Sequence, residues 1–361
     1  MSCLFSISRC VRIALLISVL SLVCLSGSYA ERPIVGYVRF DCLGGVESQD
    51  TVISVQFHRP PSLIGRASNV SAIAGETTLA IQDAGFLADS FTGVPHYAIV
   101  TSGTARGQFF NVSSNSTTEV VIDTGSATLA GLAAGDSLMV IPHWTLNTLF
   151  PQATQTALHE STGALPSQRQ TELHFFDVSS KGIELSADSV YFVTSTGWKQ
   201  VEKGYPSAND VVIPPGSAMI VRHPAGAAST EFHAYSHVLQ SDFALSLEAD
   251  ALVTMDRTVS LARPVPVTLE NLDLDSVFEE SATSNPGDRK DELLVFSTTS
   301  GAINTLPTTT YFRTSGSWVL DDNNTYPNAN TDEISAGAAM VIRKAPDGSG
   351  SSMIWLNTAR Y

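Results

Sequence analysis

The sequence predicts an all-β protein with two related domains in tandem, each a β-sandwich or β-barrel-like unit, the first carrying an inserted small β-barrel. Three observations lead to this expectation. The segment "YFVTSTGWKQVEKGYPSAN" at 191–209 returns as "YFRTSGSWVLDDNNTYPNAN" at 311–330, which indicates an internal duplication. Short runs rich in Val, Ile, Thr and aromatic residues alternate with Gly, Ser and Asn turns. No window has the periodicity of a long amphipathic helix.

The first thirty residues have the pattern of a secretory signal peptide. Two arginines precede the apolar run "IALLISVLSLVCL" at 13–25, and a small residue follows at Ala30, as a signal peptidase requires. Because the run is shorter than the roughly 20 apolar residues that span a bilayer, we expect cleavage after Ala30 and no membrane span afterwards. A lipoprotein signal at Cys24 is the alternative, although Val23 stands where a small residue is expected.

An insertion is predicted in the first of the two copies. "DTVISVQFHRP" at 50–60 resembles "DRTVSLARP" at 256–264, and "TLNTL" at 145–149 matches "TLENL" at 268–272. Residues 61–141 have no counterpart in the second copy. They contain strand-like runs separated by turn residues, so we expect them to form a small β-barrel of their own.

Each copy then continues with a hairpin and a further strand. "DSVYFVTSTGWKQV" at 188–201 alternates in part around a Ser-Thr-Gly turn, and "SAMIVRH" at 217–223 corresponds to "AAMVIRK" at 338–344. From these matches we divide the chain into a signal peptide, a first repeat domain in two segments, an inserted module and a second repeat domain. These parts occupy 1–30, 31–60 with 142–228, 61–141 and 229–361.

Charge and cysteine content limit the expected partners. The chain has 20 Lys and Arg against 35 Asp and Glu, a formal net charge of −15. Such a surface repels nucleic-acid phosphates and anionic lipids, so we expect no nucleic-acid partner. Removal of the signal leaves Cys42 as the single cysteine, which excludes an intrachain disulfide. Cys42 is expected to be a small buried hydrophobe, with intermolecular pairing as the alternative.

The duplicated tryptophans, Trp198 and Trp318, are the candidate ligand-binding residues. A tryptophan presented on a β surface can stack on a sugar ring or on a proline of a peptide. The alternative is that each indole anchors its own hairpin to a core, and the duplication agrees equally well with that interpretation. We favour packing anchors, because the flanking polar residues differ between the copies. Trp144 and Trp355 have no copies and are expected to be packing residues.

Two arginines are polar residues that the duplication retains. Arg222 and Arg343 occupy equivalent positions in the last aligned strands. We expect each to form a structural ion pair, Arg222 with Glu172 and Arg343 with Glu292.

An acidic turn in the second copy offers a weak calcium alternative. Its oxygen ligands lack the regular spacing of a known calcium-binding loop, and the first copy has Lys203 at the corresponding place. We therefore favour a solvated turn and predict no metal. The residues concerned are Asp321, Asp322, Asn324 and Asp332.

Other chemical motifs are incomplete. His233 and His237 can share one face of a strand, but no third ligand follows at a spacing typical of zinc sites. "SGTARG" at 102–107 lacks the lysine of a phosphate-binding loop, and the sequence contains no Gly-x-Ser-x-Gly elbow. We expect neither cofactors nor catalytic residues.

The order of these segments resembles an uncharacterised, paralogous family of exported bacterial proteins. The resemblance covers the chain after the signal, and its most specific parts are the Trp-containing hairpin and the strand within "DVVIPPGSAMIVR" at 210–222. It implies an exported protein with this architecture and implies no activity.

The sequence thus favours a non-catalytic protein with a structural or interaction role, located in the periplasm, at the cell surface or in the medium. The alternative is a module that binds extracellular glycan through the hairpin tryptophans. A hydrolase is the third possibility, and the expected partner is an extracellular glycan or a protein.

Overall fold

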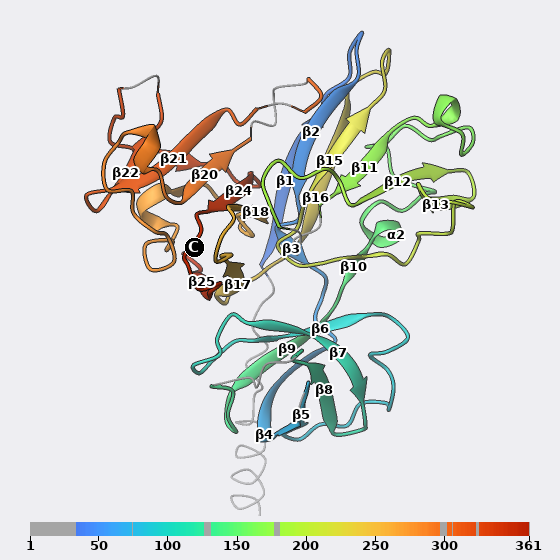
Figure 1. The fold of residues 1–361 in the computed structure, drawn as a ribbon. Coiled ribbons are helices and arrows are strands. Elements are labelled where there is room, and N and C mark those ends of the chain that lie inside the picture. The colour runs from blue at the N-terminus through green and yellow to red at the C-terminus, as the bar shows by residue number, and fades with distance from the viewer. Residues whose placement is uncertain are drawn as a thin grey trace, which may run out of the picture. The chain divides into compact units, whose positions relative to one another are not determined.

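The structure is a computed structural model, and it confirms the all-β prediction (Figure 1). Strands dominate the described chain, and its helical segments are the four-residue helix α2 (Leu146–Leu149) and three short 3-10 turns. These turns are η1 (Pro166–Gln168), η2 (Leu269–Asn271) and η3 (Pro286–Asp288). The structure describes residues 34–73, 75–125, 131–176, 181–296, 302–304, 306–322 and 325–360.

The first repeat contains a five-stranded antiparallel sheet and a smaller sheet that share one apolar core. The large sheet has the order β13 (Gly197–Gln200), β12 (Ser189–Thr194), β11 (Glu172–Phe175), β15 (Ala218–His223), β2 (Gln49–Ser54). The smaller sheet has the order β1 (Val35–Cys42), β16 (Thr230–Val238), β3 (Phe57–His58), and β10 (Trp144–Thr145) pairs with β14 (Val212–Ile213).

The second repeat has the same strand order. Its large sheet runs β22 (Ser317–Leu320), β21 (Thr309–Thr314), β20 (Glu292–Val295), β24 (Ala339–Lys344), β18 (Met255–Ser260). Two pairs complete it: β17 (Phe243–Glu248) with β25 (Ser352–Asn357), and β19 (Val267–Thr268) with β23 (Glu333–Ile334).

The register of the two large sheets is also the same. Leu173 lies opposite Tyr191 across β11 and β12, and Leu293 lies opposite Tyr311 across β20 and β21. Residues that match in the sequence therefore occupy equivalent positions in two sheets with the same strand order and register.

The structure places the boundary between the repeats later than the sequence suggested. The second repeat was expected to start at 229, but β16 pairs with β1 over residues 230–237. Phe232, Ala234 and Val238 of β16 belong to the core of the first repeat. The first repeat therefore extends to Val238, and the second begins with β17.

The inserted segment forms a closed six-stranded barrel. Residues on β8 alternate, since Val120 and Ile122 face the core while Glu119 and Asp123 are exposed. The barrel consists of β4 (Leu63–Ile73), β5 (Glu76–Ile81), β8 (Glu119–Asp123), β7 (Phe109–Asn115), β6 (His96–Val100) and β9 (Ser137–Pro142).

The first and last strands of the barrel pair with each other, and this explains how the insertion fits into a loop. Leu63 at the start of β4 lies opposite Val140 near the end of β9. The chain therefore returns close to the point at which it left the first repeat, and the repeat needs no rearrangement to carry the barrel.

The two repeats contact each other through reciprocal hydrogen bonds. The hydroxyl of Ser54 on β2 donates to the carbonyl of Gly337 at 2.8 Å. The backbone N–H of Ser260, the counterpart of Ser54 on β18, donates to the carbonyl of Gly216 at 3.0 Å. Since Gly216 and Gly337 are also counterparts, each repeat presents the same surface to the other, as in an isologous dimer interface.

Candidate functional site

The duplicated tryptophans are buried packing residues. Trp198 and Trp318 are each 1% exposed. The ring of Trp198 packs on Phe150 with centroids 6.1 Å apart, and its Nε1 donates to the Phe150 carbonyl at 3.1 Å. Trp318 packs on Phe278 at 4.9 Å. Neither indole can stack on a ligand without unfolding its repeat. Trp198 and Trp318 are therefore excluded as residues that bind a glycan.

The residues around each tryptophan explain why the hairpin sequence occurs twice. Asn209 Oδ1 accepts a hydrogen bond from the backbone N–H of Trp198 at 2.9 Å, and Asn330 Oδ1 does the same for Trp318 at 2.8 Å. The asparagine that ends each repeated segment thus ties the loop back to the hairpin. Its retention reflects the fold.

The Tyr-Pro pair inside the repeated segment has a structural role as well. Tyr205 and Tyr326 both adopt the left-handed backbone conformation with φ of 46°. Their rings contact Phe192 and Phe312 edge-on. A bulky residue in this strained conformation persists only where its packing fixes the turn.

The retained arginines pair most closely with aspartates, which the sequence did not indicate as partners. Arg222 binds Asp50 through Nε and Nη2, both at 2.7 Å. Arg343 binds Asp256 in the same bidentate way at 2.8 and 3.0 Å. An arginine in a central strand has neighbours on both sides, and the aspartates of β2 and β18 lie directly opposite.

The predicted glutamates lie on the other side of the same arginines. Glu172 is opposite Arg222 in register, but its carboxylate binds Arg169 at 2.7 Å. Glu292 is opposite Arg343, with an oxygen 4.0 Å from Nη1, at the limit of an ion pair.

The two aspartates also join the repeats to each other. Asp50 of the first repeat accepts a hydrogen bond from the backbone N–H of Asn304 in the second at 3.1 Å. Asp256 of the second repeat accepts one from the N–H of Glu184 in the first at 2.9 Å. The retained Arg–Asp pairs are therefore part of the reciprocal interface.

The structure does not assemble the acidic turn into a metal site. Asp321 binds Arg289 at 3.1 Å, Asp322 accepts a weak hydrogen bond from Thr325 at 3.5 Å, and Asn324 lies outside the described residues. Asp332 lies at the following turn, where its N–H donates to Ala329. Within the described part of the chain, no group of three or more His, Cys, Asp or Glu is placed to hold a metal ion.

The histidines considered for zinc have other partners. His233 hydrogen-bonds Tyr37 and lies 3.0 Å from Glu231, whereas the ring of His237 packs edge-on against His58. Cys42 is buried, and burial raises the pKa of its thiol to about 12. It therefore serves as a small core residue.

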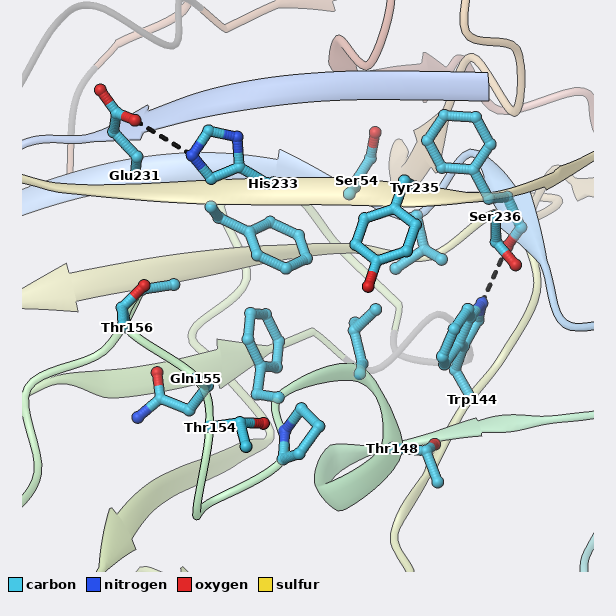
Figure 2. A pocket seen from close by; sticks show the side chains of 18 of the residues that line it. Ser54, Trp144, Thr148, Thr154, Gln155, Thr156, Glu231, His233, Tyr235 and Ser236 are labelled. Atoms are coloured by element: carbon cyan, nitrogen blue, oxygen red, sulfur yellow. Dashed lines mark hydrogen bonds and ion pairs between the residues drawn. The ribbon is translucent and has the colours of Figure 1, made fainter. Parts of the chain in front are cut away.

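A pocket of about 560 Å³ lies in the first repeat, beside β16 (Figure 2). Residues 231–237 all line it, although successive side chains of a strand point to opposite faces. The pocket therefore follows the edge of the strand and also borders the face that carries Phe232 and Ala234. The other edge of β16 is paired with β1 over residues 230–237.

The opposite wall of the pocket is formed by α2 and the segment that follows it. Figure 2 shows Thr148, Thr154 and Gln155 across the pocket from β16. The side chain of Gln155 bonds both the N–H and the carbonyl of Leu158, at 2.8 and 3.0 Å, which fixes this segment.

The interior of the pocket is largely apolar. Trp144, expected to be only a packing residue, lines it, and its Nε1 donates to the Phe57 carbonyl at 2.9 Å. Glu231 is the single carboxylate among the lining residues, which include neither lysine nor arginine. Further apolar lining comes from Val35, Val55, Phe57, Leu149, Phe150 and Phe232.

The corresponding place in the second repeat is filled. Trp355 on β25, the counterpart of β16, is fully buried, and its Nε1 donates to the Leu272 carbonyl at 2.7 Å. Leu272 and Leu274 are fully buried beside η2. The segment that forms this wall is three residues shorter in the second repeat. Thr145 and Arg169 are 24 positions apart in the first repeat, and Thr268 and Arg289 are 21 positions apart in the second.

Sequence reasoning missed this pocket, although two signals for it are present. The first is the longer segment between Thr145 and Arg169, and the second is Trp355, a large residue without a copy.

Comparison with known proteins adds no further information. No protein-family model matches the chain, and no curated protein or solved structure is similar to it at a level that indicates a relationship. In the described residues, no helix combines the length and apolar composition needed to cross a membrane.

Proposed function

We propose that this is an exported, non-catalytic binding protein whose ligand occupies the pocket beside β16. One observation carries the proposal: the same fold occurs twice in the chain, open at this place in the first repeat and filled by Trp355 in the second. The second repeat shows that a closed core is compatible with the fold. The opening in the first repeat therefore needs a separate reason, and ligand binding supplies one.

The shape and chemistry of the pocket support this role. Its volume lies within the roughly 300–1,000 Å³ typical of ligand sites. Aromatic and aliphatic side chains form most of the interior, and a few polar groups such as Thr148 and Thr154 line one side. The second repeat and the barrel serve as scaffold in this account.

An extracellular glycan is the second candidate ligand, now on different residues. Tyr37 and Tyr235 lie opposite each other on β1 and β16 and are 57% and 70% exposed. Exposed aromatic rings are the surface on which sugar rings stack.

The test is to fill the pocket and measure entry of an uncharged apolar dye, Nile red. Ala234 is a buried residue of β16 that lines the pocket, so Ala234→Trp places an indole inside it. Ala282→Trp, at an exposed position of the second repeat, is the matched control. We expect one dye per wild-type or control molecule and at least a tenfold loss of affinity in Ala234→Trp. Equal binding by all three proteins, or by none, contradicts the proposal.

A further inference from the structure

We infer that the ligand of this pocket is an extended peptide segment of another protein, added as a strand to the free edge of β16. This inference rests on the proposed function. It names the partner and the mode of recognition.

Among the described residues, one edge of β16 is unpaired over most of its length. Along β16, the strand β3 pairs only with His237 and Val238, and in the described chain residues 231–236 pair with β1 alone. In an antiparallel ladder, every second residue directs its N–H and C=O away from the partner strand. These groups face the pocket, over a length of about 20 Å for six residues. An extended peptide is the ligand whose own backbone satisfies them.

The pocket forms a groove along this edge, and the groove is closed at both ends. The hydroxyl of Thr230 donates to the carbonyl of Ala157, which joins the start of β16 to the opposite wall. At the other end of the groove, β3 pairs with this edge of β16 at His237 and Val238. A peptide of roughly five or six residues fits between these limits.

A strand bound in the groove would have an apolar environment on one side and a polar one on the other. One face of the groove is apolar, with Phe57, Phe150 and Phe232, whereas Thr154 and Gln155 lie on the wall across from β16. Because side chains of a strand alternate, we expect apolar residues at every second position of the peptide.

Charge identifies the remaining feature of the partner. Glu231 lies at the end of the groove near Thr230, but its carboxylate already pairs with Arg39 at 3.6 Å and with His233 at 3.0 Å. No lining residue is a lysine or arginine, and the whole chain has a net charge of −15. A segment with a net positive charge therefore complements this protein better than an acidic one.

The experiment selects peptides from a displayed library of random octapeptides on the full-length exported protein. We expect enrichment of alternating apolar sequences that carry a net positive charge. In the selected peptide, methylation of every second backbone nitrogen leaves the side chains intact but removes main-chain hydrogen-bond donors. This methylation should weaken binding at least tenfold if the peptide backbone hydrogen-bonds to the edge of β16.

The outcomes separate this inference from the proposed function. Loss of both dye and peptide binding in Ala234→Trp, with both retained in Ala282→Trp, supports the inference. Strand addition is overturned, and the proposed binding function is unaffected, if the dye enters the pocket but the library yields no peptide. The same holds if the methylated peptide binds as well as the unmethylated one.

Two other results would assign the pocket to another occupant. These are binding to a glycan array in place of peptides, and a concentration-dependent dimer that Ala234→Trp abolishes. Absence of dye binding removes the proposed function itself.

Discussion

Single side chains explain which parts of the duplicated sequence have been retained. The matching residues, such as Trp198 with Asn209 and Trp318 with Asn330, hold each hairpin to its core. They could be predicted as packing anchors from the sequence, because bulk and turn residues match while flanking polar residues differ. The partners of Arg222 and Arg343 could not, since a sequence does not show which neighbouring strand supplies the carboxylate.

Truncation of either tryptophan should destabilise its repeat. Trp198→Ala and Trp318→Ala each remove a fully buried indole, so we expect the free energy of unfolding to fall by roughly 3–5 kcal/mol. Chemical denaturation followed by circular dichroism measures the change. An unaltered unfolding midpoint in both variants is incompatible with the packing role.

Acidification should destabilise the first repeat through a buried histidine. His223 bonds Thr171 and Thr230 at 2.8 and 2.9 Å, and burial and the nearby His159 lower its pKa from 6.5 to about 4. The unfolded chain takes up the proton near pH 6.5, whereas the folded protein resists it. The stabilisation is therefore complete above pH 6.5 and is lost as the pH falls toward 4.

Denaturation at pH 7 and pH 4.5 tests this effect. We expect His223→Gln to show a smaller pH-dependent loss than the wild type. The second repeat has Lys344 paired with Asp291 at the equivalent positions and so lacks this histidine. An identical pH dependence of the wild type and the variant argues against His223 as the responsible group.

Individual strands show how far the sequence predicts this fold. The hairpin of β12 and β13 and the strand β15 are visible in the alignment, because their aromatic and Met residues match those of β21, β22 and β24. The glycines that precede β15 and β24, Gly216 and Gly337, match as well. The strand β16 was assigned to the wrong repeat. Its core residue Phe232 has no identical counterpart in β25, where Trp355 is the large buried residue, so the alignment gives no register there.

The pocket could not be predicted for a related reason. It depends on three extra residues in an irregular segment after α2 and on the free edge of a strand that the alignment did not identify. Both are properties of how elements meet in space, which local patterns do not contain.

The Arg–Asp pair between β2 and β15 gives a prediction for these strands. Asp50 is buried and bonds both Arg222 and Asn304, so Asp50→Asn leaves the half-buried Arg222 cation without its charge partner. We expect a loss of about 3 kcal/mol in the free energy of unfolding. Glu172→Gln, at the partner predicted from sequence, should cost less than half as much. The reverse order of the two variants would restore Glu172 as the main partner.

The described chain as a whole combines a duplicated scaffold with an inserted barrel. The repeats exchange hydrogen bonds at equivalent positions, as two subunits of a symmetric dimer do, although the donor differs. The Ser54 hydroxyl donates to Gly337, and the Ser260 backbone N–H donates to Gly216. The barrel contacts the second repeat, since Phe109 stacks on Phe243 at 5.2 Å and Arg106 pairs with Asp242 at 2.6 Å.

Excision of the barrel should leave a folded protein. Because β4 and β9 are paired neighbours at the ends of the insertion, removal of 61–141 and joining of the flanks requires a short connection. We expect cooperative unfolding to persist at a lower midpoint, since removal of the barrel exposes the Phe243 ring on which Phe109 stacks. A non-cooperative transition would show that the barrel is part of the repeats' own fold.

The most direct test of ligand binding beside β16 is hydrogen–deuterium exchange resolved to single amides, with and without the selected octapeptide. In the free protein we expect fast exchange at alternate amides of residues 231–236. Bound peptide should protect these amides strongly and leave β25 unchanged, because Trp355 fills the equivalent place there. Protection that appears in β25 or in the barrel, or no protection along β16 at saturating peptide, would contradict the account.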